Sequence, residues 1–216
     1  MLNGLTQLNV ELTSTCDKQT LCAFCGHQDP TISPTLKYGQ MRESLLSAIS
    51  REVEPLGYGL TVQFHRDGDP LAYPHVKKAL ALFEGHIRSI VTHGEALGRK
   101  ASELIDNCEA VTVSVFRGDP DRSIQLSSIR SFLEQKGSRL PRLLIKVVGD
   151  MSIEELDEYR ALNVQIINRL IHVPTGNDKY AHRLPTIPEH GLCLDRIAAI
   201  MWRSLRHNTC AKLKVC

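Results

Sequence analysis

The sequence predicts an α/β protein built on a parallel sheet, and two observations carry that prediction. Six segments with the composition of strands alternate with segments whose apolar residues recur at helical spacing. Polar and glycine-containing pieces follow the strand segments directly, which is where parallel α/β folds place their functional residues. This alternation is compatible with a full barrel, a partial barrel or an open doubly wound sheet.

The first half of the chain opens with a short strand at residues 9–12, which leads into a cysteine-containing loop. A helix is expected over residues 41–56, because its apolar residues keep helical spacing. Residues 60–65 alternate apolar and polar side chains and predict the second strand. A helix around residues 76–83 and a third strand at residues 87–91 continue the order.

The second half repeats the pattern. Its predicted elements are a helix at 97–105, a strand at 111–116, a helix around 129–133, a strand at 143–148, and, after one more helix, a strand at 164–173. The helix around residues 129–133 is expected to end near Gly137, since glycine is a common C-terminal cap. The last helix begins at a capping-box pair, Ser152 and Glu155.

Composition is that of an ordinary globular protein. The 216 residues, 42% of them hydrophobic and 23% charged, suffice for a large core. A formal net charge of +2 gives no reason to expect nucleic acid or a membrane surface as partner, and no apolar run approaches the roughly 18 residues of a membrane span. The N-terminus lacks the pattern of a secretory signal, so we expect a cytoplasmic protein in which the seven cysteines are metal ligands or free thiols.

Three cysteines, Cys16, Cys22 and Cys25, lie in the loop after the first strand. Soft thiolate ligands of this kind select zinc or iron–sulfur clusters. With His27 as a fourth ligand, the loop would be a structural zinc site. With the three cysteines alone, it would hold a [4Fe–4S] cluster that has one iron without a protein ligand.

The cysteine loop and the motifs after the next strands together resemble the radical S-adenosylmethionine (radical SAM) enzymes. An aromatic residue, Phe24, precedes the last cysteine of the loop. Residues 67–70, Asp-Gly-Asp-Pro, stand where the family has Gly-Gly-Glu-Pro, and residues 92–94, Thr-His-Gly, stand where it often has Thr-Asn-Gly. One feature departs from the family: the gap of five residues between Cys16 and Cys22 is longer than usual.

The resemblance implies a fold and a chemistry. The fold would be a partial (β/α)6 TIM-like barrel over residues 1–176, followed by a small irregular C-terminal appendage over residues 177–216. A [4Fe–4S] cluster would reduce S-adenosylmethionine (SAM) and cleave it to methionine and a 5′-deoxyadenosyl radical, which abstracts hydrogen from a small-molecule or peptide substrate. An electron donor such as flavodoxin or ferredoxin would be the partner.

The resemblance also implies site residues. Cys16, Cys22 and Cys25 would hold the cluster. The expected SAM contacts lie in the cluster loop and at the ends of later strands: Phe24, Gly68, Asp69, Pro70, Ser114 and Lys146. Within this set, Phe24 would pack beside the adenine, and residues 68–70 would line the methionine end.

Strand alternation adds a prediction for the last two of these residues. Val111, Val113 and Val115 share one face of the fourth strand, so Ser114 is expected on the other face, where it either bonds the ribose or fills the barrel. Lys146 would point inward by the same alternation. An unpaired buried charge is costly, so Lys146 requires a partner, which is either the methionine carboxylate or a protein carboxylate.

The last three cysteines, Cys193, Cys210 and Cys216, lie in the appendage. The stretch around Cys193 looks like the start of a reduced or truncated SPASM or twitch-type extension. Such extensions hold auxiliary clusters in many radical SAM enzymes, so the tail either binds a second Fe–S cluster or carries idle thiols. Two further alternatives are a zinc-stabilised binding protein without catalysis and a degenerate family member that serves as a partner subunit.

Overall fold

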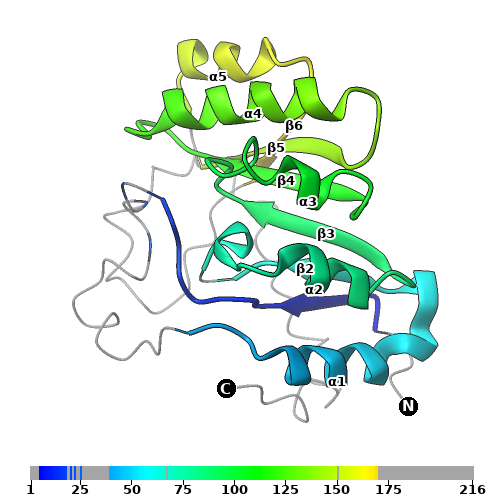
Figure 1. Ribbon diagram of the computed structural model, residues 1–216. Coiled ribbons are helices and arrows are strands. Elements are labelled where there is room, and N and C mark those ends of the chain that lie inside the picture. The colour runs from blue at the N-terminus through cyan, green and yellow to red at the C-terminus, as the bar shows by residue number, and fades with distance from the viewer. Residues whose placement is uncertain are drawn as a thin grey trace, which may run out of the picture.

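The computed structural model describes residues 5–18, 20, 22, 25, 39–66, 68–149 and 151–169. Over this part of the chain a single sheet has six strands in the order β1-β2-β3-β4-β5-β6 (Figure 1). All neighbouring strands are parallel. Each strand therefore lies beside the strand that precedes it in the chain, as in a partial barrel, whereas a doubly wound sheet reverses its strand order. The predicted α/β partial barrel is confirmed.

The strands are β1 (Gln7–Val10), β2 (Thr61–Phe64), β3 (Ile87–Thr92), β4 (Ala110–Val115), β5 (Arg142–Val148) and β6 (Gln165–Arg169). The α-helices are α1 (Glu43–Val53), α2 (Val76–Leu82), α3 (Ala101–Leu104), α4 (Arg122–Lys136) and α5 (Ile153–Arg160). Two 3-10 helices complete the set, η3 (Glu54–Gly59) and η4 (Pro70–Ala72). In Figure 1, α1 and α2 lie beside the first strands of the sheet, and α4 and α5 beside the last.

The core lies between the sheet and its helices. Val111, Val113 and Val115 of β4 are completely buried in it, together with Ile129 and Phe132 of α4. The predicted alternation on β4 is therefore correct, and Ser114 lies half-buried on the opposite face. None of the helices within the described residues is long and apolar enough to cross a membrane.

Two predicted helices are shorter in the structure. The helix expected over residues 41–56 ends at Val53, and the chain continues as the 3-10 helix η3, in which Gly57 adopts a positive φ of 52°. Pro55 lacks a backbone N–H and favours this break. Of the helix expected over residues 97–105, only Ala101–Leu104 is α-helical.

The other described elements lie where they were predicted, although α4 begins at Arg122, well before residue 129. α4 ends at Lys136 and is followed by its C-cap Gly137, which has a φ of 55°. Both hydrogen bonds of the Ser152–Glu155 capping box are formed at the start of α5. β1 ends at Val10 rather than at residue 12. The end of the predicted sixth strand, residues 170–173, and the predicted appendage, residues 177–216, lie outside the described residues.

Candidate functional site

Three thiols gather at the carboxyl edge of the sheet, directly after β1. Cys16, Cys22 and Cys25 are thiols that form no disulfide, and each is partly exposed. The backbone N–H of Cys25 donates to the carbonyl oxygen of Cys22 at 2.8 Å, which closes a turn between the second and third cysteines. Burial raises the pKa of Cys22 to about 12; the nearby Lys18 ammonium opposes this rise, and the thiols of Cys25 and Cys16 add to it. The thiols of Cys16 and Cys25 therefore both act on the Cys22 thiol.

The motif after β2 packs directly on the backbone that enters this loop. A Cβ atom on Gly68 would lie 2.1 Å from the carbonyl oxygen of Thr13 and 2.6 Å from that of Thr15. The neighbouring Asp69 N–H donates to the Thr15 carbonyl oxygen at 2.9 Å. Only glycine fits at position 68, because any side chain would collide with main-chain atoms that cannot swing away.

The carboxylate of Asp69 accepts hydrogen bonds from groups of the protein itself. One oxygen caps η4 by accepting from Leu71 N–H at 2.8 Å. The other accepts from the Thr92 hydroxyl at 2.7 Å and from His93 N–H at 2.8 Å. Asp69 thus ties the end of β2 to the end of β3, and its predicted contact with SAM stays a prediction.

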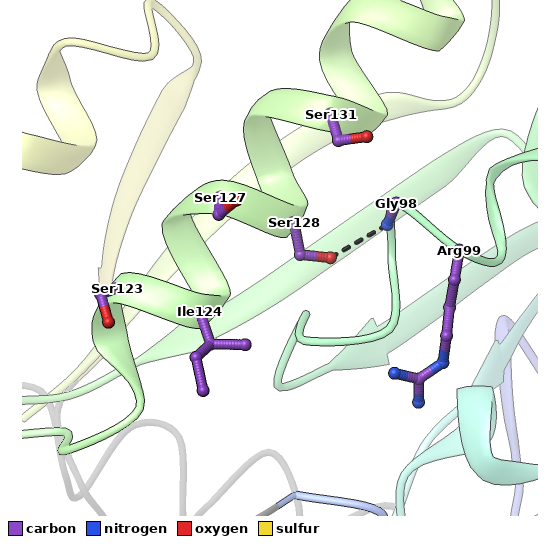
Figure 2. A pocket seen from close by; sticks show the side chains of 7 residues that line it. All are labelled: Gly98, Arg99, Ser123, Ile124, Ser127, Ser128 and Ser131. Carbon is purple, nitrogen blue, oxygen red and sulfur yellow. Dashed lines mark hydrogen bonds between the residues drawn. The ribbon is translucent and has the colours of Figure 1, made fainter.

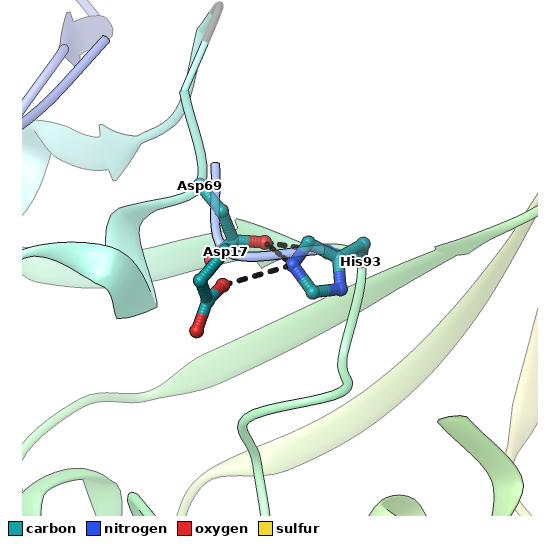
Figure 3. A group of neighbouring side chains, drawn as sticks. All are labelled: Asp17, Asp69 and His93. Atoms are coloured by element: carbon teal, nitrogen blue, oxygen red, sulfur yellow. Dashed lines mark hydrogen bonds and ion pairs between the residues drawn. The ribbon is translucent and has the colours of Figure 1, made fainter. Parts of the chain in front are cut away.

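His93 links the same carboxylate to the cysteine loop. Its Nε2 atom lies 3.2 Å from Asp17 Oδ1 and 3.3 Å from Asp69 Oδ2. Figure 3 shows the imidazole in contact with both carboxylates. Burial lowers the pKa of His93, but hydrogen bonds to Asp17 and Cys16 and the charge of Asp69 outweigh burial and raise it to about 10. The imidazole therefore favours its charged form between the two carboxylates.

The ligand atoms of Asp17, Asp69 and His93 lie within 4.8 Å of one another, a spacing that could also suit a cation. Each of these side chains, however, already has protein partners. Asp17 pairs with the guanidinium of Arg99 as well as with His93. We therefore assign the group to holding the loop against the ends of β2 and β3.

A second ionic group, formed by Lys18 and three carboxylates, lies at the same edge and is buried. The Lys18 ammonium, with a side chain that is only 1% exposed, contacts carboxylate oxygens of Glu95, Asp119 and Asp121, each at 2.8 Å. Asp121 also accepts from the backbone N–H of Thr20 at 2.8 Å. Burial lowers the pKa of Lys18, but the hydrogen bonds to the three carboxylates outweigh it, so the pKa is raised overall.

The segment that carries Glu95 and Arg99 rests on α4. Ser128 accepts from the N–H of Gly98 at 3.0 Å, and a Cβ atom on Gly98 would lie 3.1 Å from the Ser131 hydroxyl oxygen (Figure 2). A shallow pocket of about 510 Å³ opens along this seam. Small serine side chains on α4 thus allow the segment after β3 to approach closely.

Ser114 and Lys146 are neighbours in the sheet. They are register partners on β4 and β5, and Lys146 is paired in turn with Ile167 on β6. Lys146 is 8% exposed and alternates with Ile145 and Val147, which belong to the core. The predicted placement of both side chains on the face away from the core agrees with this burial pattern, and their SAM contacts stay predictions.

The remaining predicted site residues fall outside the described residues. These are Phe24, His27, Cys193, Cys210 and Cys216. The first two belong to the cluster loop, and the other three belong to the predicted appendage, so the adenine contact, the zinc alternative and the second cluster all stay predictions.

Sequence reasoning missed the ionic groups around the loop: Asp17, Lys18, His93, Glu95, Asp119 and Asp121. Two signals could have indicated them. A lysine inside a metal-binding loop needs carboxylate partners if it is buried. In addition, the carboxylates of Glu95 and Asp119 follow β3 and β4, whose carboxyl ends meet at the edge where the loop lies.

Comparisons with known proteins give a result at the level of the fold. No model of a known protein family matches the sequence, and no curated protein is significantly similar to it. The crystal structure of BtrN in complex with AdoMet and 2-DOIA aligns with a TM-score of 0.50 and 16% sequence identity, covering 80% of this chain and 58% of BtrN. The chain therefore spans less than two thirds of the length of BtrN.

Two further structures are similar over shorter stretches. Selenomethionine-labelled BtrN in an open conformation gives a TM-score of 0.41 at 17% identity, covering 56% of this chain and 55% of that one. Archaeal TYW1 gives a TM-score of 0.39 at 16% identity, with coverages of 60% and 52%.

BtrN is a radical SAM enzyme, so the described part of the chain has the fold of that class of enzymes. The resemblance that the cysteine loop and the strand-end motifs predicted is confirmed for the fold. Substrate and reaction do not follow from a likeness at 16% identity.

Proposed function

We propose that the chain is a radical SAM enzyme and that Cys16, Cys22 and Cys25 hold its [4Fe–4S] cluster. One observation carries the proposal: three cysteine thiols that form no disulfide lie in the loop after β1, at the functional edge of a sheet with the radical SAM fold. The donor set fits the group, because thiolates are the ligands that iron–sulfur clusters prefer. Cys108, the remaining described cysteine, is buried just before β4 at the opposite edge.

When bound, the cluster supplies one electron to SAM, and the reductive cleavage of SAM yields methionine and a 5′-deoxyadenosyl radical that takes hydrogen from the substrate. The residues of the chain position the cluster loop and bind SAM. Gly68 and Asp69 hold the loop against β2 and β3. The hydroxyl of Ser114 and the ammonium of Lys146 are donors for the ribose and for a carboxylate, respectively.

The substrate, the electron donor and the tail complete the proposal. The substrate is a small molecule or a peptide, and flavodoxin or ferredoxin supplies the electron in the cytoplasm.

Cys193, Cys210 and Cys216 are the candidate ligands of a second cluster. Iron and sulfide counting on a variant with all three loop cysteines changed to alanine tests the second cluster, since residual iron is expected only if the tail binds one.

The proposed activity is tested by anaerobic reconstitution with iron and sulfide, followed by addition of reductant and SAM. We expect the wild type and the Cys108→Ala control to release 5′-deoxyadenosine. The Cys16→Ala/Cys22→Ala/Cys25→Ala variant should release none. Absence of 5′-deoxyadenosine from a wild type that carries a full cluster would reject the enzyme and favour the partner-subunit alternative.

The zinc alternative gives different results in the same experiment. A protein that holds zinc through Cys16, Cys22, Cys25 and His27 would be colourless after reconstitution and would contain zinc in preference to iron. The [4Fe–4S] proposal predicts a brown protein that contains iron and sulfide in equal amounts.

A further inference from the structure

The unusual gap between Cys16 and Cys22 contains a buried cation. Lys18 is the second residue of that gap, and its side chain is 1% exposed. The three carboxylates around its ammonium are also buried, with side-chain exposures of 6% for Glu95, 1% for Asp119 and 9% for Asp121. The side chain of Lys18 thus extends from the cluster loop to the carboxyl edge of the sheet.

The three carboxylates belong to two different strand connections. Glu95 follows β3, whereas Asp119 and Asp121 follow β4. Asp121 also accepts from Thr20 N–H, so the backbone beyond Lys18 is fixed to the same connection. These contacts attach one loop to the ends of two neighbouring strands.

Lys18 offsets part of the negative charge of this group, in which one ammonium faces three carboxylates. Three carboxylates that converge on one point repel one another, and burial strengthens the repulsion. Among the described residues Asp119 Oδ2 has no hydrogen-bond partner, and its other oxygen accepts from Lys18. Lys18 is therefore the cation around which Glu95, Asp119 and Asp121 assemble.

We propose that Lys18 is a positioning residue, which holds the cysteine loop in its binding conformation by joining it to Glu95, Asp119 and Asp121. The inference rests on the proposed cluster site, but the position of the loop can be measured in the metal-free protein.

The test compares alkylation rates of individual cysteines in the metal-free, reduced protein by peptide mass spectrometry. In Lys18→Met we expect Cys16, Cys22 and Cys25 to react at least about tenfold faster than in the wild type, because the loop opens locally. Buried Cys108 reports on the rest of the fold, and its rate should not change. Loss of the Lys18 charge would by itself slow Cys22, since that charge lowers the pKa of its thiol. A faster reaction of Cys22 in Lys18→Met would therefore show that the alkylating reagent reaches the thiol more easily.

Lys78→Met is the matched control. Lys78 pairs with Glu43, and its side chain is 63% exposed, so this change also removes one lysine and one ion pair, away from the loop. We expect wild-type alkylation rates for all cysteines in Lys78→Met. Lys18→Arg keeps the positive charge and should restore most of the protection that Lys18→Met loses.

Two results would overturn the proposal. One is loop cysteines that react in Lys18→Met as slowly as in the wild type. The other is a Cys108 rate that rises as much as the loop rates, which would assign Lys18 to the fold as a whole. Asp121→Ala leaves Lys18 in place but removes its contact with this side chain, and we expect it to accelerate the loop cysteines as well. A wild type that fails to make 5′-deoxyadenosine would refute the enzyme without changing these rates, so the two failures are distinguishable.

Discussion

Gly68 decides how closely the loop can lie against the sheet. Its missing side chain lets Asp69 reach the Thr15 carbonyl oxygen. In Gly68→Ala we expect the free energy of unfolding to fall by about 1–3 kcal/mol, because the added methyl group collides with backbone atoms. The iron content after reconstitution should fall as well. Urea unfolding and iron analysis measure the two effects.

The control for this change is Gly85→Ala. A Cβ atom at Gly85 meets nothing within 4 Å, and Gly85 has no positive φ. We expect Gly85→Ala to unfold and to bind iron like the wild type. Equal effects of the two changes would show that the close contact at Gly68 has no energetic importance.

The sequence indicated residues 67–70 as a motif but not what Gly68 and Asp69 contact. A resemblance identifies residue types in order, whereas the contacts depend on how strand ends meet in three dimensions. Lys18 illustrates the same limit. Lysines are mostly exposed, so nothing local marks Lys18 as buried until Glu95 and Asp119 are brought beside it by β3 and β4.

At the scale of elements, the capping box of α5 connects that helix to its surroundings. Ser152 accepts from Glu155 N–H at 3.2 Å, and Glu155 accepts from the N–H groups of Ser152 at 3.3 Å and Gly118 at 2.9 Å. Glu155 also pairs with Arg122 at the start of α4. One cap therefore orders the connection after β4 as well as α5.

Removal of this cap should cost stability. For Ser152→Ala we expect a loss of about 0.5–2 kcal/mol, because the first turn of α5 loses its acceptor. The exposed Ser127 on α4 provides the comparison, and Ser127→Ala should change the free energy of unfolding by less than about 0.5 kcal/mol. Chemical denaturation of both variants measures the difference, and equal values would contradict the role of the cap.

Elements with a strong local signal were predicted well from the sequence. β4 shows the alternation of a strand, and α5 begins with a capping box. Both signals depend only on residues that are close in the sequence. The helix expected over residues 97–105 was wrong in extent, because apolar spacing also fits a turn whose residues are buried. Leu97 and Leu104 are both fully buried, although only Leu104 lies in an α-helix.

At the scale of the whole molecule, the strand order follows from simple rules. Consecutive parallel strands joined by helices tend to be neighbours, which favours the order β1 to β6, but the alternation alone also allowed a doubly wound order. The long-range ionic contacts across the carboxyl edge are not predictable in this way. Lys18 and Asp121 are separated by 103 residues in the chain, and only the side-by-side order of the strands brings them together.

Buried ion pairs also make the stability of the molecule dependent on pH. Arg88 of β3 and Glu109 before β4 form a partly buried pair of this kind, with Nη2 and Oε1 2.7 Å apart. Burial tends to raise the pKa of Glu109, but hydrogen bonds from the Arg88 side chain and backbone N–H outweigh burial and lower it from 4.5. Because the folded pKa lies below the unfolded one, this pair contributes fully above about pH 4.5 and less as the pH falls through the folded pKa.

Glu109→Gln should therefore flatten the acid side of the stability profile. We expect the variant to be less stable than the wild type by about 1 kcal/mol at pH 7 and to lose less stability between pH 6 and pH 3, because it has no carboxyl group to protonate at this site. Urea unfolding of the metal-free protein across this range measures the slope, with the exposed Glu52→Gln as control. A slope in Glu109→Gln as steep as in the wild type would show that the acid sensitivity arises at other carboxylates. Asp121 and Glu155 are candidates, because ion pairs and hydrogen bonds lower their pKa values as well.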